Sequence, residues 1–188
     1  MNSFDFDRGN IEAILKEMLG PNAQFRPDQY ESIKSVVRNR GKHLIVQKTG
    51  WGKSIVYFII TKLLRKEGSG PVLLISPLLA LMRNQIFNAE KIGINAKSIS
   101  YKNANELNPI KNSLNNNEID ILLVSPERLA NKKFLQQILP ALGEIGMLVV
   151  DEVHCISDWG HDFRPDYKRI KNLIQQNFND VPIIGTTA

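Results

Sequence analysis

Residues 148–154 read Leu-Val-Val-Asp-Glu-Val-His, an apolar run that ends in two adjacent carboxylates. Short apolar runs rich in β-branched residues are typical of strands that are buried on both faces of a parallel sheet. Because successive side chains of a strand point to opposite faces, Asp151 and Glu152 should leave the strand tip in different directions. We therefore predict a strand that presents two carboxylates at one edge of a sheet, where they can hold a metal ion and a water molecule.

Similar apolar runs recur along the chain, and helical patterns separate them. The predicted strands span 43–47, 72–76, 96–100, 119–125, 147–151 and 181–186. The predicted helices span 11–19, 27–39, 54–66, 78–91, 127–138 and 166–177, and the Asn-rich residues 103–117 are helical only in part. Asn10 is a candidate cap for the first helix, and Pro27 suits the first turn of the second. This alternation predicts an α/β fold in which helices cover both faces of a mostly parallel sheet, with ligands at the carboxyl ends of its strands.

The composition argues against several classes of protein. The 188 residues are 43% hydrophobic and 23% charged, which suits one globular domain with a sizeable core. No apolar run approaches the roughly 20 residues of a membrane span, and residues 1–5 do not resemble the start of a secretory signal. The single cysteine, Cys155, rules out an internal disulfide and predicts a small buried side chain rather than a zinc ligand. The net charge of 24 − 19 = +5 favours a polyanionic partner.

A glycine-rich turn precedes the third predicted helix. Residues 49–54 read Thr-Gly-Trp-Gly-Lys-Ser and follow a predicted strand. In such a turn the backbone N–H groups and the positive end of the helix bind phosphate, the lysine reaches the β- and γ-phosphates, and the serine hydroxyl binds Mg²⁺. Gln47 stands where the strict pattern has a glycine. Trp51 at the tip of the turn shields a nucleotide, contacts a second domain or is merely exposed, and the sequence leaves these alternatives open.

The two carboxylates of the opening stretch complete this phosphate site. A carboxylate on Mg²⁺ is the usual second half of such a site, and we assign that role to Asp151, together with Ser54. Glu152 is the candidate general base for an attacking water. We therefore predict that Lys53, Asp151 and Glu152 are catalytic residues that act on a nucleotide bound with Mg²⁺.

These motifs resemble those of the superfamily 2 helicases. The resemblance rests on residues 48–54 and on Asp-Glu-Val-His at 151–154, which match the DExH form of the second motif. Further stretches, in matching order and spacing, resemble motifs of the RecQ DNA helicase family; they are 25–29, 76–85, 125–129, the aromatic-rich 155–167 and 185–188. The resemblance implies a three-layer RecA-like P-loop NTPase domain over residues 1–188. Residues 1–24 would be its N-terminal helical extension, and a second RecA-like domain is absent from this chain.

The resemblance also implies roles for individual residues. Gln29 would hydrogen-bond the adenine edge of ATP with Arg26 nearby, although without the resemblance Gln29 would be assigned to a helix surface. His154 would couple the ATP site to the DNA side, and Thr186 and Thr187 would link the two. The predicted nucleotide-binding set is Arg26, Gln29, Thr49, Gly50, Gly52, Lys53 and Ser54.

The aromatic-rich loop would contact DNA. Trp159 would sense DNA by stacking on unpaired bases, and Arg164 would contact phosphate or stack. Phe163 and Tyr167 lie four residues apart, so they either stack on bases or pack on the sheet, and we favour packing for Tyr167. The predicted set for DNA binding or coupling is Arg83, His154, Trp159, Phe163, Arg164 and Thr187.

The implied function is that of the motor domain of an ATP-dependent DNA helicase. It would act on single-stranded and partly duplex DNA, at the nucleoid of a bacterial cytoplasm or in a eukaryotic nucleus. The alternatives are another superfamily 2 translocase on RNA or duplex DNA, which the aromatic loop argues against, and a non-catalytic nucleotide-binding module. The chain stops directly after a predicted strand with no closing helix, so we expect it to be part of a longer protein. Such motors take an arginine finger from their second domain. Alone, this chain should therefore bind nucleotide weakly, hydrolyse little ATP and unwind nothing.

Overall fold

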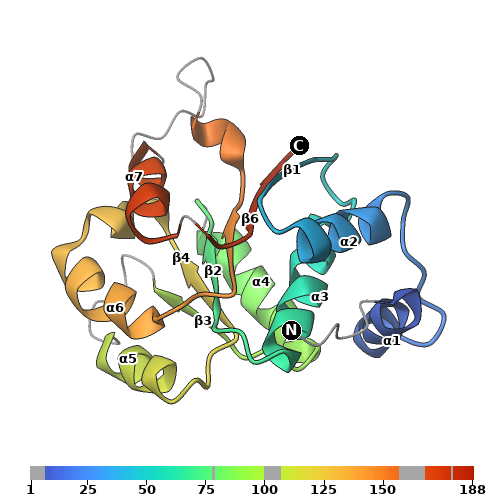
Figure 1. The fold of residues 1–188 in the computed structure, drawn as a ribbon, viewed down its shortest axis with the longest axis horizontal. Coiled ribbons are helices and arrows are strands. Elements are labelled where there is room, and N and C mark those ends of the chain that lie inside the picture. The colour runs from blue at the N-terminus through green and yellow to red at the C-terminus, as the bar shows by residue number, and fades with distance from the viewer. Residues whose placement is uncertain (1–6, 78, 100–106, 157–167, 179) are drawn as a thin grey trace.

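A parallel sheet of six strands organises the chain. The computed structural model describes residues 7–77, 79–99, 107–156, 168–178 and 180–188. Within these residues the strands lie in the order β1-β6-β5-β2-β4-β3, and every neighbouring pair is parallel (Figure 1). The strands are β1 (Lys42–Val46), β2 (Val72–Ile75), β3 (Ala96–Ile99), β4 (Ile121–Val124), β5 (Met147–Val150) and β6 (Ile183–Thr187). The predicted α/β class is confirmed.

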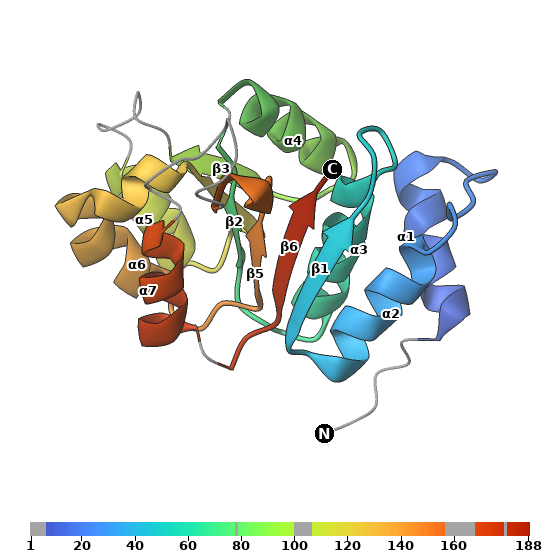
Figure 2. The ribbon, with the colours of Figure 1, turned by 90° about the horizontal axis from the view of Figure 1, so that it is seen from above.

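Helices cover both faces of this sheet (Figure 2). One side carries α3 (Lys53–Lys66) and α4 (Leu79–Lys91), with α1 (Arg8–Leu19) and α2 (Gln29–Asn39) packed against α3. The other side carries α5, α7 and the short turns of helix between β4 and β5. These are α5 (Leu107–Asn115), η2 (Pro126–Ala130), η3 (Phe134–Ile138), α6 (Leu139–Leu142) and α7 (Lys168–Asn177). Among the described helices, none combines the length and the apolar character needed to cross a membrane.

The alternation of strand side chains divides the core in two. Val72, Leu74 and Val149 lie in the apolar core beneath α3 and α4. Leu73 and Val150 lie in the second core, beneath α5 and α7. Because side chains alternate along a strand, the residue after Val150 faces the α3 and α4 side. The alternation along the apolar run therefore places the side chain of Asp151 on the side of the sheet that α3 and α4 cover.

The boundaries of three predicted helices need correction. The first helix begins at Arg8, and its cap is Asp7, whose Oδ1 accepts a hydrogen bond from Asn10 N at 2.9 Å, so Asn10 is not the cap. The second helix begins at Gln29 instead of residue 27, because Asp28 adopts a left-handed φ of 69° that the first turn of a helix does not allow. Residues 127–138 do not form one helix, since the extended backbone of Asn131 separates η2 from η3.

Candidate functional site

The turn between β1 and α3 has the backbone of a phosphate-binding loop. Its two glycines take left-handed conformations, with φ of 81° at Gly50 and 96° at Gly52. Packing also favours glycine at position 52, because a Cβ there would lie 2.7 Å from Nε2 of Gln29. α3 begins at Lys53, directly after the second glycine, and its N-terminus faces the loop with the partial positive charge that favours anions.

Gln29 ties the start of α2 to this loop. Its side chain is only 3% exposed, and Nε2 donates to the carbonyl oxygens of Trp51 at 2.9 Å and Gly52 at 3.4 Å. Its Oε1 accepts a hydrogen bond from Arg26 N at 2.9 Å, and the Arg26 guanidinium donates to the carbonyl of Gly50. Gln29 is therefore buried against the loop and does not lie on a helix surface. The adenine contact expected of Gln29 stays a prediction.

Trp51 is buried, although it stands at the tip of the loop. The side chain is 6% exposed and belongs to the same apolar core as residues of α1, α2 and α3. This excludes the alternative of a merely exposed tryptophan. The indole anchors the middle of the loop while Gln29 holds its carbonyl, so the glycines on both sides of Trp51 carry the bend.

Lys53 reaches back across the loop that precedes it. Its ammonium donates to the carbonyl oxygen of Gln47 at 2.7 Å, and the side chain is half-buried. A backbone carbonyl is a weaker partner for an ammonium than a phosphate oxygen, since hydrogen bonds between two charged groups are the stronger ones. The contact thus holds the Lys53 ammonium inside the loop, where it can reach an anion bound by the backbone of the glycines.

The side chain of Asp151 lies on the side of the sheet that carries α3, as the alternation of side chains along β5 predicts. The residue is 8% exposed. Its Oδ1 accepts hydrogen bonds from the Thr186 hydroxyl and, at 3.1 Å, from the Glu152 N–H, and its Oδ2 accepts one from Gln85 Nε2 at 3.0 Å. Thr186 reaches this carboxylate because β6 is the neighbour of β5 in the sheet. These donors fix the orientation of the carboxylate at the tip of β5.

Two further residues join the P-loop helix to Asp151. Gln85 on α4 donates through the same Nε2 to the Tyr57 hydroxyl at 3.0 Å, and Tyr57 lies on α3, the helix that begins with Lys53 and Ser54. Burial, followed by the charge of Asp151, raises the pKa of Tyr57 well above its ordinary value, so the phenol stays protonated. Sequence reasoning missed both residues. The available signal was spacing, since Tyr57 lies three residues after Ser54 on one helix face.

Glu152, His154 and Thr187 form a second, more exposed cluster. Glu152 has a left-handed φ of 53°, which turns the chain away from the line of β5. Nδ1 of His154 lies 3.3 Å from Oε2 of Glu152 and 2.9 Å from Oγ1 of Thr187. The structure therefore brings the candidate base, the coupling histidine and the linking threonine together, and Thr187 follows the Asp151 partner Thr186 directly.

The donor set fits a magnesium ion shared with a nucleotide. No group of three or more His, Cys, Asp or Glu side chains that could hold a metal occurs among the described residues. Mg²⁺ is usually bound by one or two carboxylates together with phosphate oxygens and waters, so Asp151 and Ser54 suffice as protein ligands. Three buried side-chain N or O atoms lack hydrogen-bond partners in the described part of the chain, and two of them, Ser76 Oγ and Ser125 Oγ, follow β2 and β4 at the carboxyl edge of the sheet. The third is Gln85 Oε1.

Comparison with known proteins is consistent with this geometry. A family model described as DEAD/DEAH box helicase matches residues 26–188. The chain belongs to the DEAD/DEAH box helicase family. The predicted resemblance to helicases is thereby confirmed. The matched region begins at Arg26, whose guanidinium donates to the phosphate loop at the carbonyl of Gly50.

Several relatives of this helicase domain carry RecQ-type names. The chain is 36% identical to the ATP-dependent DNA helicase RecQ of Bacillus subtilis, over 86% of the chain and 26% of that protein. It is 32% identical to the ATP-dependent DNA helicase Q1 of Rattus norvegicus, over 96% of the chain and 29% of that protein. It is 35% identical to the ATP-dependent DNA helicase Q-like 4B of Arabidopsis thaliana, over 95% of the chain and 16% of that protein. The chain thus spans less than a third of each of these relatives.

The predicted DNA-contacting residues of this helicase domain are only partly placed. Trp159, Phe163, Arg164 and Tyr167 lie outside the described residues. Arg83 is exposed on α4, two residues before Gln85. Cys155, at the other end of the aromatic-rich loop, is buried at 3% exposure, as the sequence predicts.

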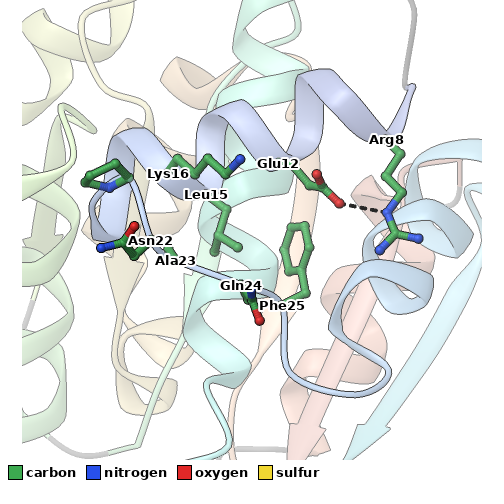
Figure 3. Close-up of a pocket in the computed structure, with 9 residues that line it drawn as sticks. Arg8, Glu12, Leu15, Lys16, Asn22, Ala23, Gln24 and Phe25 are labelled. Atoms are coloured by element: carbon green, nitrogen blue, oxygen red, sulfur yellow. Dashed lines mark hydrogen bonds and ion pairs between the residues drawn. The ribbon is translucent and has the colours of Figure 1, made fainter.

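A separate pocket lies beside the N-terminal helix of the domain (Figure 3). It has a volume of about 470 Å³ and is formed by α1 together with residues 21–25. Arg8 and Glu12 form an ion pair at its rim, with 2.7 Å between Nε and Oε1, and Leu15 and Phe25 supply its apolar wall. No residue of the phosphate loop lines it. The pocket is therefore separate from the predicted nucleotide site at the carboxyl edge of the sheet, around Lys53 and Asp151.

Replacing Gln29 with alanine should loosen the phosphate loop. The substitution leaves the carbonyl of Trp51 and the N–H of Arg26 without their partner, and an unsatisfied buried polar group costs about 1–3 kcal/mol. We expect the free energy of unfolding in urea to fall by about that amount and nucleotide affinity to fall with it. Gln176→Ala, on the exposed face of α7, is the matched control. Equal unfolding curves for Gln29→Ala and the unchanged chain would contradict a holding role.

Proposed function

We propose that this chain is the ATP-binding motor domain of a RecQ-type, ATP-dependent DNA helicase. The observation that carries the proposal is the carboxyl edge of the sheet, where Gln85 and Tyr57 connect Asp151 of the DExH motif to α3, the helix that begins with Lys53 and Ser54 of the P-loop. The names of the relatives support DNA as the polymer. Residues 1–188 would form the first RecA-like domain, with 1–24 as its helical extension.

The residues of the site divide the work of ATP hydrolysis. The backbone N–H groups of Gly50 and Gly52 and the N-terminus of α3 would bind the phosphates. The Lys53 ammonium would exchange the carbonyl of Gln47 for a phosphate oxygen. Asp151 and Ser54 would hold Mg²⁺, which neutralises charge on the phosphates when bound. Glu152, beside His154 and at the open side of the carboxyl edge, would orient the attacking water and take its proton.

Nucleotide choice and DNA response would come from residues on either side of this centre. Arg26 and Gln29 would read the adenine, so their contacts with the loop also join base recognition to phosphate binding. Arg83, Trp159, Phe163 and Arg164 would contact DNA, and His154 and Thr187 would relay that contact to Glu152. A second RecA-like domain would close over the ATP and supply the arginine finger. The protein would work wherever the cell keeps its DNA.

The test is the ATPase and unwinding activity of the full-length protein that contains this chain. Single-stranded DNA should raise its rate of ATP hydrolysis strongly, and a partly duplex DNA should be unwound only with ATP and Mg²⁺. The 188-residue chain alone should bind nucleotide and hydrolyse little. Stimulation by RNA but not by DNA would favour another superfamily 2 translocase. A full-length protein with no polymer-stimulated ATPase would contradict the motor assignment.

A further inference from the structure

Gln85 holds a bridging position between two elements of the site. Its single amide nitrogen lies 3.0 Å from the Tyr57 hydroxyl and 3.0 Å from Oδ2 of Asp151. A carboxylate only accepts hydrogen bonds, so the nitrogen and not the oxygen of the amide must face Asp151. Each N–H bond then has its own acceptor, one on α3 and one at the tip of β5. The side chain can make both contacts only while α3, α4 and β5 keep their relative positions.

Tyr57 extends the bridge to α3, the helix that begins at the phosphate loop. The residue is 2% exposed, and its hydroxyl accepts the hydrogen bond from Gln85. Tyr57 lies three residues after Ser54, on the same face of α3. The contacts therefore run from Asp151 to the helix that carries Ser54, the other predicted protein ligand of Mg²⁺, through groups that are not ligands themselves.

The remaining atom of the amide also bears on this site. Gln85 Oε1 is buried and has no hydrogen-bond partner among the residues that the structure describes. Leaving a buried acceptor unsatisfied costs about 1–3 kcal/mol, so a glutamine with a purely structural role would destabilise the fold at this position. A magnesium ion keeps several of its waters, and an acceptor close to Asp151 suits a hydrogen bond from one of them.

We propose that Gln85 is a positioning residue for the magnesium site, where with the Tyr57 hydroxyl it fixes the Asp151 carboxylate relative to Ser54. The inference rests on the proposed function, since it assumes that Asp151 and Ser54 share a nucleotide-bound Mg²⁺. Groups that orient metal ligands typically change metal affinity or activity by about 10–100-fold when removed. Gln85 should therefore act on the Mg²⁺ requirement more than on the nucleotide itself.

The test measures nucleotide binding by the 188-residue chain as a function of Mg²⁺ concentration, using a fluorescent ATP analogue. Gln85→Met keeps the length of the side chain and removes both N–H donors. We expect it to raise the Mg²⁺ concentration at half-maximal binding about 10–100-fold, while affinity in EDTA stays within a factor of about two. Tyr57→Phe, which deletes one oxygen from the same bridge, should shift the Mg²⁺ midpoint in the same direction. Asn84→Ala, the exposed neighbour on α4, should shift neither quantity.

Each outcome has a separate meaning. If the unchanged chain binds nucleotide without any dependence on Mg²⁺, the proposed function fails at this site. If its binding depends on Mg²⁺ and both Gln85→Met and Tyr57→Phe keep the same midpoint, the positioning role is wrong while the proposed function stands. An equal loss of affinity with Mg²⁺ and in EDTA would mark a structural role only, and would also overturn the inference. Should Gln85→Met fail to fold, Tyr57→Phe decides alone.

Discussion

Lys53→Ala is expected to lower the ATPase rate of the full-length protein about 10²–10³-fold, the loss typical of removing one donor to a developing oxyanion. In the structure the ammonium donates to a carbonyl within its own loop, at 2.7 Å from Gln47 O. Its removal therefore takes away a charge aimed at the phosphates while the backbone of the loop, held by Gln29 and Trp51, keeps its shape. Nucleotide binding by the 188-residue chain should weaken as well.

The matched control for Lys53 stands at the other end of the same helix. Lys66→Ala removes an identical charge from the exposed last turn of α3 and should change neither nucleotide binding nor hydrolysis. Circular dichroism and urea unfolding would show that both variants are folded. A Lys53→Ala protein that hydrolyses ATP as fast as the Lys66→Ala protein would refute the assignment of the loop to phosphate binding.

Glu152→Gln is expected to separate binding from chemistry. Glutamine keeps the size of the side chain but cannot accept a proton, and loss of a general base costs about 10²–10⁴-fold in rate. Because Asp151, Ser54 and Lys53 are untouched, the affinity for ATP with Mg²⁺ should be retained. The kcat of the full-length protein with DNA should thus collapse at nearly unchanged KM, measured by steady-state hydrolysis.

Glu144→Gln supplies the comparison for Glu152. Glu144 is exposed and precedes the amino end of β5, whereas Glu152 follows its carboxyl end. The same change of charge at the far edge of the sheet should leave kcat and KM as they are. If Glu152→Gln raised KM for ATP as much as it lowered kcat, Glu152 would be a binding residue, and the base would have to be sought elsewhere.

Much of the architecture was predictable because the apolar runs determine the strands, the type of sheet and the direction of the side chains. Apolar runs such as 147–150 are buried on both faces, so they predicted the parallel sheet, and the ends of its strands to within two residues. Side-chain alternation then predicted that Asp151 and Glu152 part at the strand tip, and the structure puts Asp151 on the α3 side. The Gly50 and Gly52 positions were equally clear, because left-handed backbone is easiest for glycine.

The partners of these residues were harder to predict, for a physical reason. Periodicity tells which face of an element a side chain takes, but it carries no information about which distant residue stands opposite. Gln85 meets Asp151 across 66 positions of sequence, and Gln29 meets Trp51 across 22. Local conformations that run against intrinsic preference were missed as well, among them the left-handed Asp28 and the extended Asn131.

The position of β1 at the edge of the sheet affects how the protein folds during its synthesis. In the described sheet β1 pairs with β6 and no other strand, matching Lys42 with Ile183 and Val46 with Thr187. On the ribosome, the strand that leads into the phosphate loop emerges early and must wait for the last strand of this sheet before it gains its partner. Contacts so distant in sequence form slowly. We therefore expect the nascent chain to complete the predicted nucleotide site only after β6 has been synthesised.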